Sequence, residues 1–170
     1  MDFKNHFDRL VKSKEFQKFK KEYPQAYFCS GFFAIDKEGK DNQQNLDYYE
    51  PELKKMFSFK LQDKVELIPV ENIESTGKEY VPEKLKDNYD FTFEYIENLV
   101  EGEMFEKKVN KKITKMLFSM QAKEGKGYLI GTIFLAGLGL FKITIDLDNK
   151  IVTESEKKSF FDMINIVKKE

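Results

Sequence analysis

Apolar residues near the N-terminus recur at the three- and four-residue spacing of a helix. Between Phe3 and Tyr23 they alternate with Lys, Asp and Glu, and Pro24 closes the pattern. Apolar positions at this spacing form one stripe that packs on a core while the charged face meets water. A second stripe, with Asp90 as its N-cap, predicts another helix over about 90–109.

Three strands are predicted after each helix. In the first half the aromatic run 26–36 leads into a hairpin turn, and strands follow at 46–49 and 56–61, with 65–68 a candidate for a further short one. Alternation of apolar and polar residues over 56–61 is the period-two pattern of a half-buried strand. The strands predicted for the second half are 113–122, 128–136 and 140–147.

The remaining segments predict a linker and a last helix. Residues 71–88 are polar, contain Gly77 and Pro82 and lack a period, as is typical of a linker. Thr153-Glu-Ser-Glu156 has the spacing of a capping box, in which two side chains satisfy free backbone N–H groups of a helix start. The apolar side of the helix that would follow consists of Phe160, Ile164 and Val167.

The two halves show the same order of elements, and an ungapped offset of 86 aligns them. It places Lys37 on Lys123 and Phe32 on Phe118, and it keeps the alternation of the strands in phase. Because a one-residue slip would turn every side chain to the opposite face, this shared phase favours an internal repeat. The alternative is two unrelated halves that share a common hairpin turn. We predict an α+β fold of two tandem helix-plus-three-strand antiparallel repeats, 1–80 and 81–170, with a C-terminal helix.

The segment FKITIDLDNKIVTES, residues 141–155, combines an alternating strand, an Asp, a tight turn and an exit strand that contains Val152. With this tail after a helix and three strands, the chain resembles the PepSY family and its cystatin-like relatives. The first half also resembles small archaeal proteins of unknown function with two such modules. The resemblance implies a binding or regulatory module. Asn149 stands where PepSY turns have Gly, and the Gln-Val-Val-Ala-Gly-like loop of inhibitory cystatins is not found.

Composition excludes several classes of function. The chain of 170 residues has a net charge of −1, and Arg9 is its only arginine. A dedicated nucleic-acid binder would show a basic excess and guanidinium groups that read base edges, so nucleic acid is not a predicted partner. A single Cys excludes an internal disulfide, and a single His argues against a conventional zinc site and a Ser-His-Asp triad. No metal, cofactor or catalytic residue is predicted.

The chain shows no sequence signal for secretion or for crossing a membrane. The N-terminal residues carry charges throughout and lack an apolar stretch, so the cytoplasm is the expected location. The uncharged stretch Gly127–Phe141 has 15 residues and four glycines, whereas a spanning helix needs about 20 apolar residues. This uncharged stretch is therefore predicted to form two buried strands joined by a turn.

The first strand supplies the candidate binding residues. It is apolar on both faces, whereas the matching strand of the second half has one polar face. A strand of this kind must be covered twice or leaves an exposed apolar patch. The candidate surface consists of Tyr27, Cys29, Phe33 and Ile35, with Tyr48 and Tyr49 at its edge. The alternative is that the predicted C-terminal helix covers these side chains.

Two motifs contain residue types that can act as a nucleophile or bind a metal, but both have simpler structural explanations. A Cys29–His6 pair is conceivable, although a buried cysteine usually acts as a small apolar residue. Asp146, Asp148 and Asn149 lack the further ligands of a calcium loop and fit a hairpin turn. We therefore expect a non-enzymatic module that binds a protein partner or associates with itself through the apolar sheet or an exposed strand edge. The alternative is a carrier of a small apolar ligand between sheet and helices.

Overall fold

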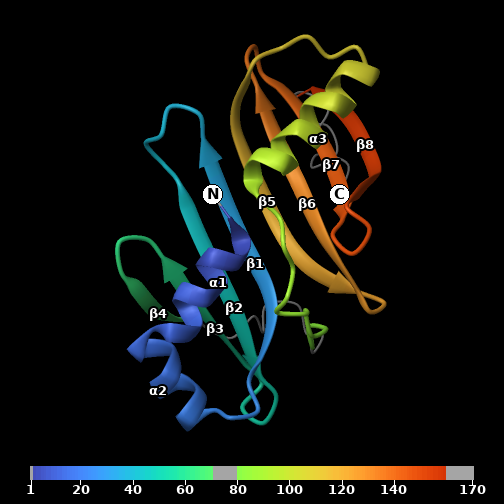
Figure 1. Cartoon of the computed structure of the whole chain (residues 1–170). Helices are drawn as coiled ribbons and strands as arrows, with labels where there is room; N and C mark the ends of the chain where they lie inside the picture. The colour runs from blue at the N-terminus through green and yellow to red at the C-terminus, as the bar shows by residue number, and fades with distance from the viewer. Residues whose placement is uncertain (1, 71–79, 160–170) are drawn as a thin grey trace, which may run out of the picture.

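The computed structural model describes residues 2–70 and 80–159. Eight strands form one antiparallel sheet in the order β4-β3-β2-β1-β5-β6-β7-β8 (Figure 1). The strands are β1 Tyr27–Asp36, β2 Gln43–Glu50, β3 Lys55–Leu61, β4 Val65–Val70, β5 Ile113–Lys123, β6 Lys126–Leu135, β7 Gly139–Asp146 and β8 Ile151–Ser159. Each half of the chain thus contributes four neighbouring strands, and β1 pairs with β5 in the middle.

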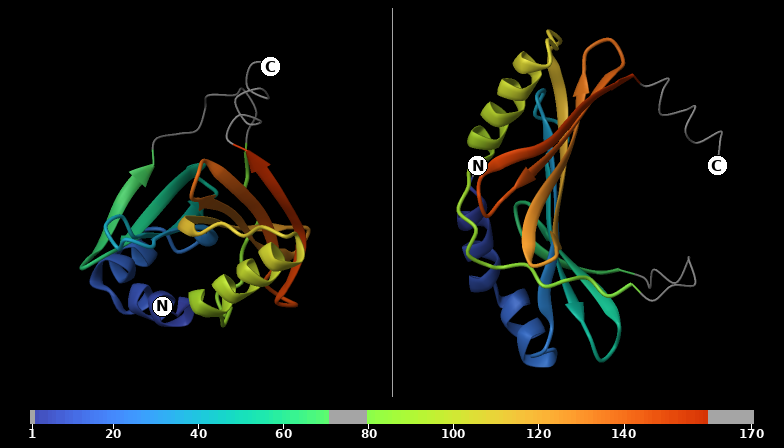
Figure 2. Two further views of the ribbon diagram at one scale, coloured as in Figure 1. Left: turned by 90° about the horizontal axis from the view of Figure 1, so that it is seen from above. Right: turned by 90° about the vertical axis from the view of Figure 1, so that its right-hand side faces the viewer.

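Three helices, α1 Phe3–Lys12, α2 Lys14–Glu22 and α3 Phe93–Glu106, lie on the same face of the sheet (Figure 2). The single N-terminal helix of the sequence prediction is two helices, because Ser13 leaves helical geometry, ends α1 and caps α2 through its side chain. The N-cap of α3 is Thr92, two residues after the predicted Asp90. The sheet curves away from the helices, so its other face is concave (Figure 2).

The core fills the space between the helices and the sheet and is rich in aromatic rings. Phe3 of α1 stacks on Phe91 with ring centroids 5.0 Å apart, and Phe33 of β1 contacts Phe93 of α3 at 4.8 Å. Burial of one such side chain stabilises the fold by roughly 1.5–3 kcal/mol. The backbone N–H of Phe3 also donates to the carbonyl of Phe91 at 3.1 Å, so the starts of α1 and α3 are joined.

The prediction of two tandem helix-plus-three-strand repeats is wrong. The four strands of each half belong to one continuous eight-stranded sheet, in which pairing of β1 with β5 joins the two halves. The capping-box prediction is also wrong, because Thr153–Glu156 lies within β8 and pairs with β7. An available strand edge on β7 outweighs a short local helix signal. Phe160, Ile164 and Val167 lie outside the described residues, as does the central part of the predicted linker.

The phase of the proposed repeat fails in β1 because the strand contains a β-bulge between Phe28 and Ser30. A bulge inserts one extra residue, so the residues after it change face. Phe28 and Phe33 therefore both join the core, although they are five positions apart. Phe33 lies opposite Phe118, so Phe32, which the offset places on Phe118, faces the other way.

The uncharged stretch Gly127–Phe141 forms most of β6 and the start of β7, as two strands joined by a turn. Gly131 is needed there, because a Cβ atom at this position would come within 2.7 Å of the Phe118 ring. Among the described residues, no helix combines the length and the apolar character needed to cross a membrane.

Candidate functional site

The concave face, opposite the helices, is called the open face here. Strand register places side chains in rows that cross it, since directly paired residues point to the same side. One row crosses β1, β2, β3 and β4 without a polar side chain interrupting its packing. This apolar row consists of Tyr27, Tyr49, Met56 and Val70. The Tyr27 and Tyr49 rings are 5.7 Å apart, and Tyr49 is 4% exposed while the other three are half-buried.

The next row holds a carboxylate between two hydroxyl groups. Ser30 donates to Asp47 Oδ2 at 2.7 Å, and Asn45 Nδ2 donates to Ser58 Oγ at 3.2 Å. Burial raises the pKa of Asp47, and the hydrogen bonds from Ser58 and Ser30 oppose this shift without cancelling it. The Asn45 Oδ1 atom is buried and has no hydrogen-bond partner among residues 2–70 and 80–159. Ile68 of β4 ends this row at the edge of the sheet.

Cys29 is the extra residue of the bulge and lies between the two rows. Its Sγ atom contacts Asp47 O at 3.4 Å and Met56 Sδ at 3.5 Å. Burial, followed by the nearby Asp47 carboxylate, raises the pKa of the thiol to about 12. His6 lies on α1, on the other side of the sheet. The Cys29–His6 pair is therefore absent, and the thiol is not activated as a nucleophile at neutral pH.

The structure brings only some of the predicted site residues together. Tyr27, Cys29 and Tyr49 are neighbours on or beside the apolar row. Phe33, Ile35 and Tyr48 belong to the core side under the helices, so the prediction that they share one surface with Tyr27 and Cys29 is wrong. For Phe33 and Ile35 the physical reason is the bulge, which reverses the alternation after Cys29. Tyr48 pairs with the core residue Phe28, so the alternation of β2 places it on the opposite face from Tyr49.

Sequence reasoning missed Met56, Val70 and Ile68 as members of the same surface. Met56 begins the alternating segment of β3, and Ile68 and Val70 lie in the short strand β4. The alternation of 56–61 is visible in the sequence, but the partner strands and the register that align Met56 and Val70 with Tyr49 are not. Pairing of distant strands is information that a single period-two pattern does not contain.

The other half of the open face is polar and charged. Its rows mix single apolar side chains with polar ones, as in Leu117, Thr132, Lys142 and Glu156. Asp146, at the end of β7, accepts hydrogen bonds from Asp148 N, Asn149 N and Asn149 Nδ2 at 2.8–3.0 Å. This arrangement matches the predicted hairpin turn. Burial opposes ionisation of Asp146, but these donors outweigh it, so its pKa lies below the ordinary value.

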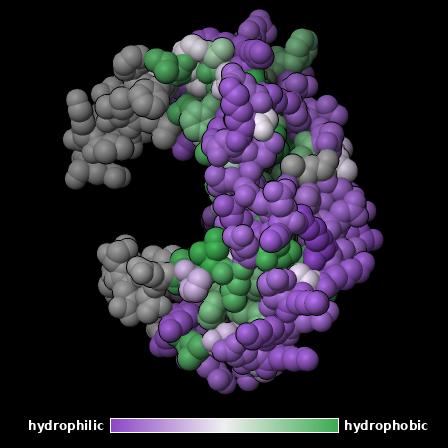
Figure 3. Space-filling view, turned by 90° about the vertical axis from the view of Figure 1, so that its left-hand side faces the viewer, coloured by the Kyte–Doolittle hydropathy of each residue, from purple (hydrophilic) through white to green (hydrophobic). Residues whose placement is uncertain are grey.

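The two edge strands differ in the same way as the two halves of the open face, one being more apolar and the other more charged. On β4, Ile68 is 40% exposed on the open face, while Leu67, which pairs with the core residue Phe59 and faces the helix side, is 37% exposed. Figure 3 shows hydrophobic residues gathered along this edge beside the hollowed side of the molecule. On β8, charged residues dominate after Ile151. Apolar edge strands can pair with a strand of another protein, and charged ones discourage it. The apolar row and the β4 edge therefore form one continuous surface.

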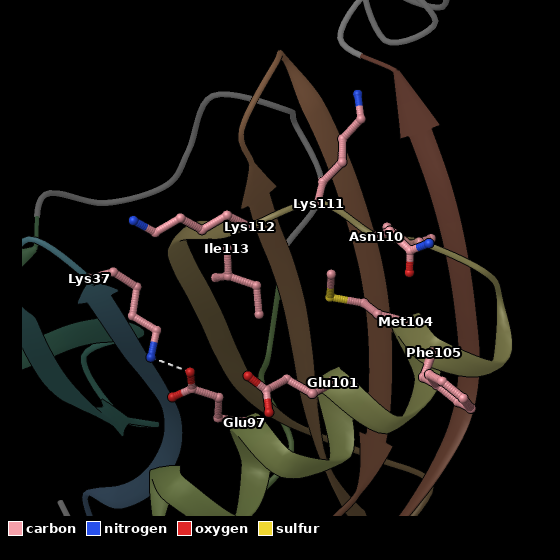
Figure 4. A pocket seen from close by; sticks show the side chains of 10 residues that line it. Lys37, Glu97, Glu101, Met104, Phe105, Asn110, Lys111, Lys112 and Ile113 are labelled. Atoms are coloured by element: carbon pink, nitrogen blue, oxygen red, sulfur yellow. Dashed lines mark ion pairs between the residues drawn. The ribbon is translucent and has the colours of Figure 1, made fainter.

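Described residues line a pocket at each end of the helix layer, on the helix side of the sheet. The α3 pocket, of about 460 Å³, lies between the end of α3 and the start of β5, with Met104 and Ile113 at its floor and Phe105 at its rim (Figure 4). Its charged groups are mixed in sign, and Lys37 forms an ion pair with Glu97 across it (Figure 4). A second pocket, of about 610 Å³, lies beside α1 and α2.

No group of three or more His, Cys, Asp or Glu side chains within residues 2–70 and 80–159 is arranged to hold a metal ion.

Comparison with protein-family models and with curated proteins yields no match. Among solved structures, the fold is similar to the crystal structure of a protein described as a putative lipoprotein from Clostridium difficile 630. The TM-score is 0.50 with 16% sequence identity, over 85% of this chain and 90% of the other. At this identity the similarity concerns the fold alone. The resemblance to PepSY and cystatin-like modules stays a prediction.

Proposed function

We propose that this protein is a non-enzymatic binding module whose partner is another protein. The partner docks on the apolar row and on the adjoining β4 edge. The observation that carries the proposal is the row itself, in which Tyr27, Tyr49, Met56 and Val70 follow one another across four strands on a face that no described helix covers. Tyrosine and methionine are enriched in the centres of protein interfaces.

The chemistry of the surface suits a partner with an extended, largely apolar segment. Such a segment can add to a sheet edge through main-chain hydrogen bonds, while alternate side chains pack into neighbouring apolar positions. Ile68 on β4 would contact the segment directly, and Met56 can adapt its unbranched side chain to the partner. Asp47 lies one row away and would accept a hydrogen bond from a donor of the partner.

The test uses two matched positions on opposite edges of the sheet. Ile68 and Ile151 are both isoleucines on edge strands, both face the open side by register, and they are 40% and 53% exposed. A photo-crosslinking amino acid is introduced at each position in the producing cells, and adducts are identified by mass spectrometry. We expect a discrete protein adduct at position 68 and none at position 151.

Affinity for the purified adduct partner is then measured by calorimetry. Ile68→Glu should weaken binding by about tenfold or more, because a charge would be buried in an apolar contact, whereas Ile151→Glu should leave binding unchanged. If the adduct is a second copy of the chain, light scattering should show a dimer that Ile68→Glu dissociates. Equal crosslinking at both positions, or equal effects of the two substitutions, would contradict the proposal.

A further inference from the structure

The two most exposed large apolar side chains among the described residues lie at the same end of the molecule. Phe105, in the last turn of α3, is 78% exposed, and Leu138, in the turn between β6 and β7, is 64% exposed. Both views of the ribbon show the end of α3 and this turn at one end of the sheet (Figure 1, Figure 2). Single exposed apolar residues are common on protein surfaces, so their significance depends on what surrounds them.

The loop 107–112, which joins α3 to β5, adds positive charge at this end. Four of its six residues are exposed lysines, namely Lys107, Lys108, Lys111 and Lys112. None of them forms an ion pair with the described residues. Glu106 is the one carboxylate of residues 105–112, so this segment has a net charge of +3, whereas the whole chain has −1. Residues 105–112 and 136–138 together are called the basic tip.

The charged side chains beside the basic tip are largely paired with one another. These ion pairs are Lys37–Glu97, Lys40–Glu38 and Lys115–Asp41. Even with Glu101 counted, which lines the α3 pocket beside Lys111 and Lys112, the ammonium groups of the tip are in excess. The tip therefore attracts anions.

The end of α3 holds the loop in place. The Lys108 N–H donates to the Phe105 carbonyl at 3.0 Å, and the Val109 N–H donates to the Met104 carbonyl at 2.8 Å. With Lys108 at a φ of +56°, this is a Schellman motif. Val109 and Met104 are buried, so the loop is anchored to the core while its lysines stay outside. Phe105 follows Met104 by about 100° around the helix and points away from the buried stripe.

The β6–β7 turn presents its leucine at a conformational cost. Gly137 and Leu138 have φ values of +77° and +62°. Glycine adopts such values freely and asparagine adopts them readily, whereas a leucine is strained there. The turn lies against the loop, because the Ala136 N–H donates to the Lys112 carbonyl at 2.9 Å and a Cβ atom at Gly137 would be 3.5 Å from Lys111 Nζ. A strained, exposed leucine is thus held beside two lysines.

We propose that the basic tip docks on the surface of an anionic lipid bilayer. Phe105 and Leu138 enter the interfacial layer, and the lysines of the loop lie at the level of the lipid phosphates. A bilayer offers an apolar phase to the two side chains and negative charge to the ammonium groups. A soluble polyanion would pair with the lysines but would offer no apolar layer to Leu138. Docking of this kind needs no spanning helix.

The opposite end of the sheet provides a contrast within the chain. Leu53, in the turn between β2 and β3, is 48% exposed (Figure 1). Residues 50–55 contain two glutamates and two lysines, so this turn has no excess of positive charge. We expect no attraction of this end to an anionic surface. The basic tip is also distinct from the apolar row and the β4 edge, so this proposal holds or fails separately from the proposed protein interface.

The first experiment uses tryptophan as a reporter, because the chain contains none. Full-length Phe105→Trp and the matched control Leu53→Trp are titrated with vesicles of phosphatidylcholine, alone or with about one third of phosphatidylglycerol. We expect the emission of Phe105→Trp to shift to shorter wavelength with the anionic vesicles alone, since its ring leaves water, and that of Leu53→Trp to stay unchanged. No shift for Phe105→Trp, or equal shifts for both variants, would overturn the proposal.

The second experiment measures co-sedimentation with the anionic vesicles. Leu138→Asn should weaken binding about tenfold, because it removes an apolar contact, while the unfolding temperature stays equal or rises as the strain is relieved. Leu53→Asn should leave binding unchanged. Each lysine near an anionic surface strengthens binding about fivefold, so Lys111→Gln with Lys112→Gln should weaken it about 25-fold. The control, Lys55→Gln with Lys84→Gln, changes two exposed lysines at the opposite end and should have no such effect.

A soluble polyanion separates the bilayer from nucleic acid as the partner. Poly-U RNA should not compete with the vesicles for the tip, and it should not shift the emission of Phe105→Trp. If the RNA binds while the vesicles do not, the lysines belong to a nucleic-acid site and the proposal is wrong. It is equally wrong if the variants of the tip and their controls bind the vesicles alike.

Discussion

Asp47 and Asp146 lie in different halves of the sheet, on the non-edge strands β2 and β7, with their side chains on the open face by register. For both, burial is the largest influence on the pKa and disfavours the ionised form. The outcomes are nevertheless opposite. The pKa of Asp47 is raised, whereas that of Asp146 is lowered.

The difference comes from the donors around each carboxylate. Asp146 receives three N–H groups of the turn that joins β7 to β8, and these are fixed by the backbone and by Asn149. Among the described residues, Asp47 receives only the hydroxyl groups of Ser30 and Ser58, its neighbours on β1 and β3. A carboxylate saturated by N–H donors stabilises a turn, whereas one held by hydroxyls keeps acceptor capacity for a partner. This contrast separates a structural acid from one on the proposed binding surface.

The largest effect that follows concerns Cys29, which touches the backbone of Asp47. With its pKa raised to about 12, the thiolate fraction at pH 8 is on the order of a thousandfold below that of a free cysteine. Alkylation by iodoacetamide in the native protein should be slowed by about this factor, and it should become fast in denaturant. Rapid labelling of Cys29 in the native protein would show that water reaches this region. Burial would then not raise the pKa of Asp47, and the contrast with Asp146 would be lost.

The next effect is on stability at the turn. Asp146→Ala removes the acceptor of three hydrogen bonds to a 3% exposed side chain, so we expect the free energy of unfolding to fall by about 2–3 kcal/mol. Urea unfolding at pH 7 measures it. Because the pKa of Asp146 is lowered on folding, its stabilisation is present above about pH 4, the ordinary Asp range, and is lost as the pH falls through the folded value. A change below about 0.5 kcal/mol would show that the turn does not depend on this carboxylate.

The smallest effect is expected for Asp47→Asn, and it has the opposite sign. A raised folded pKa means that the protonated form is favoured by folding, so the associated stability is present below about pH 4 and is lost as the pH rises through the folded value. At pH 7 a neutral amide avoids the cost of a buried charge, so the variant should match or exceed the wild-type stability, by less than about 1 kcal/mol. The difference should shrink on acidification. Loss of more than about 1 kcal/mol at pH 7 would contradict the assigned shift.

The sequence predicted those elements whose side chains alternate against a single core. Phe57, Phe59 and Leu61 of β3 all enter the core, as their period-two pattern indicates, and the candidate strand at 65–68 is part of β4. The hairpin turn predicted at Asp146, Asp148 and Asn149 is also found in the structure. In each of these cases local chemistry and tertiary contacts agree, which is the condition under which a pattern can be interpreted reliably.

The missed features depend on contacts between distant residues. Gly31 is the only residue near Cys29 in the sequence that signals a bulge, since an isolated glycine inside a strand often marks one. It does not locate the extra residue, which only the pairing with β2 shows. The Thr153–Glu156 segment satisfies a helix signal locally but becomes a strand, since β7 offers it a ladder of backbone partners. The missed bulge also explains the error in the predicted binding surface, because the bulge moves Phe33 and Ile35 into the core.

The pairing of β1 with β5 also constrains how the chain acquires its structure during synthesis. Register joins Phe33 to Phe118 and Ser30 to Gln121, so the central ladder spans some eighty to ninety residues of sequence. Contacts of such separation slow folding, because the loop-closure entropy must be overcome before they form. Until β5 leaves the ribosome, the first four strands present two open edges, β4 and β1, instead of one. A nascent chain is therefore most exposed to unwanted strand pairing in the interval before residues 113–123 emerge.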